Sequence, residues 1–169
     1  FTAYRGDPDR KITISMMPYD WFEASIFYTS IKDRPYPFFE YQDYKDKGFN
    51  AKFRLKTEGK FPAIAIGFND LAGTGIYSSE YIVGSYGADN LDLHLGIGWG
   101  RLNGGQLSYG NPLSDLDESF RTRCLSWGCD LEDSKGGTFR WKDYFSGEEI
   151  GIFGGFSYLF HDDWLFKME

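Results

Sequence analysis

The sequence predicts an all-β protein with about eight antiparallel strands in this chain, either an up-and-down transmembrane β-barrel or a soluble sandwich. Apolar and polar residues alternate with a period of two through most of the 169 residues, as in strands with one apolar face. Turn residues separate these runs about every ten positions, as in antiparallel hairpins. Aromatic side chains form 20% of the chain and 21 residues are glycine, which favours pleated strands, turns and bulges.

The first predicted hairpin joins residues 11–17 (KITISMM) to residues 21–30 (WFEASIFYTS) through a PYD turn. In the second run Phe22, Ala24 and Ile26 alternate with polar residues. This alternation places the three side chains on one face of a strand.

Residues 32–47 (KDRPYPFFEYQDYKDK) are charged and contain prolines without a clean period, so they predict a loop. Strict alternation resumes over residues 49–56 (FNAKFRLK). Here Lys52, Arg54 and Lys56 share the polar face of the predicted strand.

Three further strands are predicted over residues 63–69, 77–86 and 91–100, with turn sequences between them. The last run reads LDLHLGIGWG, and its three glycines lie inside an alternating strand. A dinucleotide-binding loop needs its glycines between a strand and a helix, so the run does not predict a nucleotide site.

A long polar and glycine-rich connection is predicted over residues 103–146, followed by strands at 148–160 and 164–169. Connections of this length are usually functional or partly disordered. Two roles stay open for it: a plug inside the barrel, or an outward surface for a partner. Trp127, Trp141 and Tyr144 are candidates for stacking on sugar rings; alternatively, the aromatic residues form the connection's own small core.

The two cysteines, Cys124 and Cys129, lie in this connection with four residues between them. This spacing suits a small disulfide loop in an oxidising compartment and does not match redox or zinc pairs. Two free thiols remain the alternative.

Composition limits the functional classes. The net charge of −7 argues against a nucleic-acid partner, because phosphate binding needs a basic face. No apolar run is long enough for a transmembrane helix. The mean hydropathy of −0.45 fits a soluble protein, and also a barrel whose strands present every second residue to lipid.

Two features favour lipid as the solvent of the apolar faces. The opposite faces are rich in Gly, Ala, Ser and charge, and aromatic residues lie near strand ends, as in an aromatic girdle. A soluble sandwich or jelly roll shows the same alternation and stays open as an alternative. In the membrane interpretation Ile64, Ile66, Phe68, Leu91, Leu93, Leu95, Ile97 and Trp99 face lipid, whereas Lys52, Arg54, Lys56, Asp92, His94, Gly96, Gly98 and Gly100 face the lumen.

No catalytic, cofactor or metal site is predicted. The SDLDES run (residues 114–119) lacks the spacing of a calcium loop. Carboxylates that a glycosidase would need in pairs are Asp70, Glu80, Asp115, Asp117, Glu148 and Glu149. Turn capping and solvation are the simpler interpretation of all six.

Several motifs in order resemble the YjbH family of bacterial outer-membrane proteins, which includes GfcD-like proteins of group 4 capsule loci. They are PAIAIG, GTG, SSEY and LGIGWGRL, then GNPL, GGTF, YFSG and IFGGFSYLF…WLFKME. The KITISMMPYDWFEASIFY segment is similar to the family's preceding hairpin.

The resemblance implies a non-enzymatic Gram-negative outer-membrane barrel that serves exopolysaccharide or capsule export or surface assembly. Its expected partners are outer-membrane lipid, the exopolysaccharide and other secretion proteins. Family members are several times longer and the chain ends in FKME without a terminal aromatic, so residues 1–169 are expected to form one barrel domain or a segment of a larger barrel. The alternative function is that of a soluble secreted carbohydrate-binding module or glycosidase.

Overall fold

The computed structural model describes residues 1–7, 9–36, 39–103, 108–123, 139, 141–161 and 164–169. They form one antiparallel ten-stranded sheet in the order β1-β2-β3-β4-β5-β6-β7-β9-β10, with β8 paired to β9. The strands are β1 (Thr2–Arg5), β2 (Asp9–Tyr19), β3 (Phe22–Tyr36), β4 (Phe39–Lys56), β5 (Ala63–Leu71), β6 (Ser79–Ala88), β7 (Leu91–Gly98), β8 (Ser108–Gly110), β9 (Glu149–Phe160) and β10 (Trp164–Met168). The predicted all-β antiparallel fold is confirmed, and the sheet adds β1 and β8 to the eight predicted strands.

The described parts of the long connection contain β8 and short 3₁₀ helices, and the described residues include no α-helix. The 3₁₀ helices are η1 (Gly100–Leu102), η2 (Pro112–Asp115), η3 (Glu118–Phe120) and η5 (Trp141–Asp143). Within the described residues, no helix has the length and apolarity to cross a membrane.

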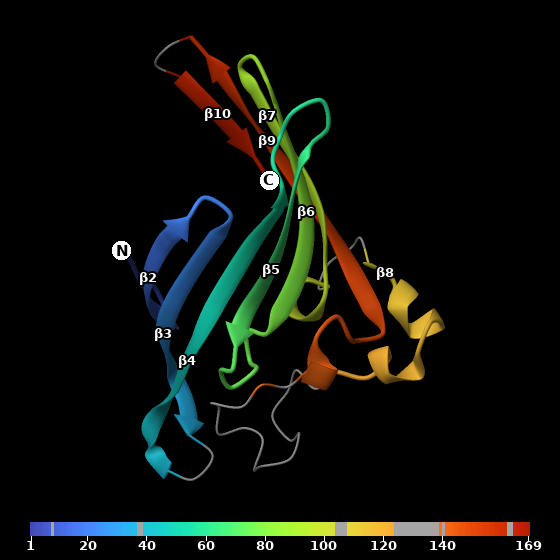
Figure 1. The fold of residues 1–169 in the computed structure, drawn as a ribbon. Coiled ribbons are helices and arrows are strands. Elements are labelled where there is room, and N and C mark those ends of the chain that lie inside the picture. The colour runs from blue at the N-terminus through green and yellow to red at the C-terminus, as the bar shows by residue number, and fades with distance from the viewer. Residues whose placement is uncertain (8, 37–38, 104–107, 124–138, 140, 162–163) are drawn as a thin grey trace.

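The two ends of the sheet differ in their connections (Figure 1). The short turns after β2, β4, β6 and β9 lie at one end, which we call the hairpin end. The end of β3, the start of β4, the β5–β6 loop and the described parts of the long connection lie at the other, which we call the loop end. In the described residues β1 and β10 each pair on one side only, so the sheet is open.

The register places the predicted apolar residues on one face of the whole sheet, which we call the apolar face. Directly paired residues share a face, and Ile14 pairs with Ile26, which pairs with Phe49. The middle of the sheet repeats the arrangement, with isoleucines from β5, β6, β7 and β9 in one row: Ile66, Ile82, Ile97 and Ile152.

In a soluble sheet the apolar face is buried and the polar face meets solvent. Here large side chains of the apolar face are exposed. On the apolar face Ile14 is 53% exposed and Leu95 is 67% exposed, whereas Phe27, on the opposite or polar face, is 1% exposed. The exposed apolar side chains, which we call the apolar belt, are Ile12, Ile14, Met16, Ile26, Tyr28, Phe49, Ile64, Tyr86, Leu93, Leu95, Ile152, Tyr158, Phe160, Trp164, Phe166 and Met168.

The loop predicted over residues 32–47 is wrong, because β3 continues to Tyr36 and β4 begins at Phe39. In this part of β4, buried Tyr44 and Asp46 alternate with exposed Lys45 and Lys47. The side chains alternate in burial, but the sequence does not alternate in hydrophobicity. Periodicity therefore did not predict this part of the strand. The ladder shifts register around Pro35, which cannot donate a backbone hydrogen bond.

A small core closes the polar face at the loop end. The β5–β6 loop brings Ile76 against Ile31 and Tyr44, and Tyr77 packs on the same cluster. The ring of Tyr77 also meets Phe27 edge-on, with centroids 6.2 Å apart. This loop therefore covers the polar face of β3 and β4 and isolates the groups beneath it from solvent.

Candidate functional site

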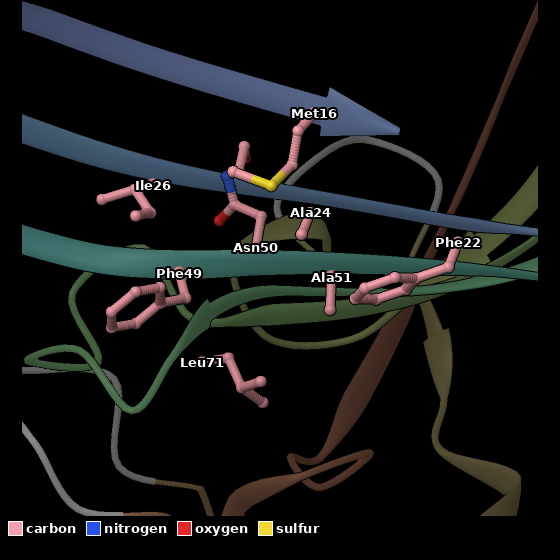
Figure 2. Close-up of a pocket in the computed structure, with 9 residues that line it drawn as sticks. Met16, Phe22, Ala24, Ile26, Phe49, Asn50, Ala51 and Leu71 are labelled. Atoms are coloured by element: carbon pink, nitrogen blue, oxygen red, sulfur yellow. The ribbon is translucent and has the colours of Figure 1, made fainter. Parts of the chain in front are cut away.

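The apolar face is the largest candidate surface, and it carries a hollow over β2 to β5 (Figure 2). The hollow has a volume of about 300 Å³. It forms where Ala24 pairs with Ala51, because these small side chains lie among larger ones. The lining residues are Met16, Phe22, Ala24, Ser25, Ile26, Phe49, Asn50, Ala51 and Leu71.

The predicted lumen residues divide between two places. Lys52 and Arg54 of β4 lie on the polar face, as do Asp92 and His94 of β7, with β5 and β6 between the two pairs. Lys52 contacts Glu23 at 4.0 Å, where both side chains are well exposed. The structure therefore places the four residues on one face without bringing them together as a site.

Lys56 differs from Lys52 and Arg54 because the ladder shifts register after Arg54. It pairs with Ile64 of the apolar face, and its ammonium group lies 4.6 Å from the ring centre of Phe61. Lys56 thus ends β4 beside the β4–β5 turn and does not form a cationic row with Lys52 and Arg54.

The placement of Trp99 in lipid is wrong. Strand β7 ends at Gly98, and Trp99 is only 2% exposed. Its indole nitrogen donates to Oδ1 of Asn111 at 3.0 Å, and its ring meets Phe145 edge-on. The described parts of the long connection therefore cover this end of the apolar face, and Trp99 fastens them to the sheet.

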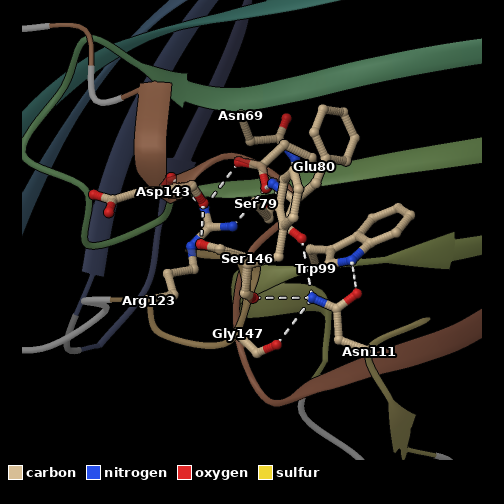
Figure 3. A network of polar contacts seen from close by, with 12 residues as sticks. Asn69, Ser79, Glu80, Trp99, Asn111, Arg123, Asp143, Ser146 and Gly147 are labelled. Atoms are coloured by element: carbon tan, nitrogen blue, oxygen red, sulfur yellow. Dashed lines mark hydrogen bonds and ion pairs between the residues drawn. The ribbon is translucent and has the colours of Figure 1, made fainter. Parts of the chain in front are cut away.

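Asn111 is the centre of that contact (Figure 3). Its side chain is fully enclosed, and Nδ2 lies within hydrogen-bond distance of three backbone carbonyl oxygens, those of Phe120, Phe145 and Gly147. Its Oδ1 also accepts from the backbone N–H of Leu113, which begins η2 with an Asx turn. One amide thus joins η3, the segment of Phe145 and Gly147 and, through Trp99, the end of β7.

Replacing Asn111 with alanine should lower the free energy of unfolding by about 3 kcal/mol, because several buried polar groups lose their partner. Asn111→Asp should cost at least as much, since a carboxylate cannot donate to the carbonyls that the amide meets. Urea unfolding followed by tryptophan fluorescence measures both. Asn90→Ala, in the exposed β6–β7 turn, is the control, and an equal loss there would contradict the role of Asn111.

A buried ion pair lies beside this amide. Arg123 donates from Nη1 and Nη2 to both carboxylate oxygens of Glu80, at 2.5 and 2.8 Å, and these side chains are 1% and 0% exposed. The Glu80 carboxylate also accepts from the backbone N–H of Phe145, and Arg123 donates to Ser78. The charges therefore compensate each other, and the pair ties the connection to β6.

The sugar-stacking candidates lie in different environments. Trp141 is 72% exposed and stacks on Phe139, with ring centroids 5.3 Å apart. Tyr144 is buried between Phe68 and Trp141, so a sugar ring cannot reach its face and this prediction is wrong. Burial, and secondly the charge of Glu80, raise the pKa of Tyr144 to about 12. Trp127, Cys124 and Cys129 lie outside the described residues.

Asp46 and Asp70 form a second buried polar centre, on the polar face at the loop end. They are 0% and 3% exposed, and Oδ2 of Asp46 and Oδ1 of Asp70 have no hydrogen-bond partner. Both lie outside the segments that carry the apolar belt: Lys45 and Lys47 flank Asp46 on the other face, and β5 turns at Asp70 with a φ of 57°.

Burial dominates the electrostatics of these two carboxyls. Burial raises the pKa of Asp46 above its usual range, although a hydrogen bond from Thr74 acts to lower it. Burial, and secondly the Asp46 charge, raise the pKa of Asp70 to about 7. Among the described residues, no group of three or more His, Cys, Asp or Glu side chains is arranged to hold a metal ion.

Sequence reasoning missed Asp46, Asn111 and Arg123. Asp46 fell in the predicted loop, and nothing in the sequence distinguishes Arg123 from its neighbours. The Asn-Pro pair at Asn111 is a turn-initiating signal, but it does not reveal burial. The remaining carboxylate candidates Asp115, Asp117, Glu148 and Glu149 are exposed, and Asp117 caps η3.

Comparison with known proteins agrees with the motifs. The YjbH family, described as exopolysaccharide biosynthesis protein YbjH, matches residues 1–169. The chain is also similar to "Uncharacterized lipoprotein YjbH" of Escherichia coli strain K12, with 32% identity over 158 residues. That match covers 90% of this chain and 22% of the relative, so the chain spans about a fifth of the relative's length. No solved structure gives a significant match.

Proposed function

The chain belongs to the YjbH family of exopolysaccharide biosynthesis proteins, and from this premise we propose that it forms wall strands of an outer-membrane β-barrel. The barrel would serve export or surface assembly of exopolysaccharide without enzymatic activity. One observation carries the proposal: the apolar belt runs from β2 to β10 and is exposed, while buried side chains such as Phe27, Thr29 and Asp46 lie on the polar face at the loop end.

The size of the belt supports lipid as its solvent. Monomeric soluble proteins rarely expose contiguous apolar patches of more than a few hundred Å², and here sixteen large apolar side chains lie on one face of the sheet. A tilted membrane-spanning strand needs about 9–11 residues, and β5, β6 and β9 have 9, 10 and 12.

The ends of the sheet also fit this role. Outer-membrane barrels have short periplasmic turns, longer external loops and aromatic girdles at the interfaces. Exposed aromatic side chains gather toward the hairpin end, including stacked Tyr19 and Trp21, Tyr158, Phe160 and Trp164. We propose that the hairpin end is periplasmic and that the loop end faces outward.

Polysaccharide contact is assigned to the loop end. The exposed stacked pair of Phe139 and Trp141 offers flat apolar faces of the kind on which sugar rings stack. The proposed role is non-enzymatic: the Glu80 carboxylate is neutralised by Arg123, and Asp70 is shielded from solvent.

The membrane role is tested on the full-length protein. It should be extracted from membranes only by detergent and should run faster on a gel without heating than after heating, as a closed barrel does. A protein that stays monomeric in buffer without detergent, and whose mobility does not depend on heating, would exclude the membrane wall. If the protein is a barrel and deletion of its gene leaves surface exopolysaccharide unchanged, the export role alone fails.

A further inference from the structure

We propose that Asp46, Asp70 and Thr29 form a binding site for a hard divalent cation such as Ca²⁺, at the loop end of the polar face. The site is independent of the proposed membrane role, because it is formed by residues shielded within the described sheet and its β5–β6 loop. It is also separate from the network of Glu80 and Asn111 on the other face.

The first observation is that the three residues present oxygens without partners. Thr29 pairs directly with Asp46 across β3 and β4, so the two side chains share the polar face. Thr29 is 1% exposed, and its hydroxyl, Oδ2 of Asp46 and Oδ1 of Asp70 have no hydrogen-bond partner. A buried polar group without a partner is costly, and three on one face of a sheet indicate that a ligand completes them.

The second observation is the space around Asp70. A Cβ on either Gly48 or Gly73 would overlap Oδ1 of Asp70. The Asp70 carboxylate therefore occupies space that is free only because residues 48 and 73 are both glycine. Its other oxygen accepts from the backbone N–H of Tyr77 at 3.2 Å, and Asp46 accepts from Thr74 at 2.7 Å, which holds the two carboxylates in place.

The third observation is that charge compensation is incomplete. Lys11 pairs with Thr29 in the same cross-strand row, and its charge acts on both carboxyls. However, its ammonium lies over the rings of Phe27 and Tyr77, at 4.7 and 5.6 Å from their centres. In the described part of the chain Lys11 forms no ion pair with either carboxylate, so two negative charges share one indirect counter-charge.

The donor chemistry selects the cation. Carboxylate and hydroxyl oxygens without imidazole or thiolate suit Ca²⁺ or Mg²⁺. Ca²⁺ tolerates irregular geometry, whereas Mg²⁺ demands near-octahedral coordination. Protonation of a buried carboxyl is the competing way to neutralise the site.

The experiment is calorimetric titration of the full-length protein with Ca²⁺ at pH 8, repeated at pH 6. We expect saturable binding with Kd of about 1 mM or tighter, weaker at pH 6 because protons compete. Asp46→Asn and Asp70→Asn should each weaken binding by about tenfold or more, since affinity follows the charge of the ligands. Asp92→Asn, on the same face at the hairpin end, should leave it unchanged.

One further variant and one further measurement on Asp70→Asn keep the test independent of folding. Lys11→Met removes a charge that repels the cation, together with the ammonium contacts to Phe27 and Tyr77, and should leave Ca²⁺ binding unchanged or tighter. In chelator, Asp70→Asn should melt no lower than wild type, since it removes a buried charge, and Ca²⁺ should no longer raise its melting temperature. Absence of saturable Ca²⁺ binding to wild type, equal weakening in Asp92→Asn, or loss of binding in Lys11→Met overturns the proposal.

Discussion

Glu80→Gln is expected to lower the free energy of unfolding by about 3–5 kcal/mol, because it leaves the guanidinium of Arg123 buried without its counter-charge. Both partners are essentially unexposed, and Arg123 donates two hydrogen bonds to the carboxylate. An exposed ion pair would contribute only about 0–1 kcal/mol, so burial determines the size of the effect.

A double-mutant cycle separates the interaction energy of the Glu80–Arg123 pair from the cost of leaving one buried charge without its partner. Glu80→Gln and Arg123→Met should each destabilise strongly, whereas the double variant should recover much of the loss, because neither charge remains. Denaturant unfolding followed by tryptophan fluorescence is the measurement, and Trp99, which packs on Phe145 beside the pair, contributes to that signal. Single losses below about 1 kcal/mol, or strictly additive losses, would contradict a buried coupled pair.

The run of residues 91–100 shows how far periodicity carried the prediction of structure. Alternation correctly placed Leu93 and Leu95 on the apolar face and Asp92 and His94 on the other, because the period of a strand is a local property of the backbone. It was wrong at Trp99, where the strand has already ended. A tertiary contact with Asn111 decides that position, and alternation carries no information about such contacts.

Each glycine of this run is required by a different packing contact, which the sequence alone does not show. A Cβ on Gly96 would overlap the ring of Phe153, and one on Gly98 would overlap Leu102. Gly100 has a φ of 66° and leaves the space that the guanidinium of Arg123 occupies. The sequence indicated small residues on one strand face, but each partner comes from a different segment of the chain.

The candidate sites were less predictable than the fold. Asp46 and Asp70 stand 24 positions apart in the sequence. The pairing of β4 with β5 brings them near enough for the Asp46 charge to act on Asp70. The apolar belt was predictable because it repeats in every strand. A polar centre made of single residues from different strands has no period, so sequence alone does not reveal it.

Leu95→Arg should block membrane insertion of the full-length protein, because its side chain is the most exposed apolar group of β7. An arginine at the bilayer midplane on the lipid face of a barrel costs about 2–4 kcal/mol. Leu95 pairs with Gly84 and Gly154 on either side, so no neighbouring side chain from these positions shields it. The expected result is loss of the heat-modifiable form from the membrane fraction, with a matching loss of surface exopolysaccharide.

His94→Arg is the matched control, because it places the same side chain one residue away on the polar face of the same strand. Under the membrane proposal it should insert nearly as wild type, since its charge points away from lipid. If the polar face were a closed dry core, both substitutions would be damaging, and His94→Arg would be the worse. If the apolar face met water in a soluble protein, Leu95→Arg would be harmless. The ratio of inserted protein in the two variants therefore identifies which solvent each face of the sheet meets.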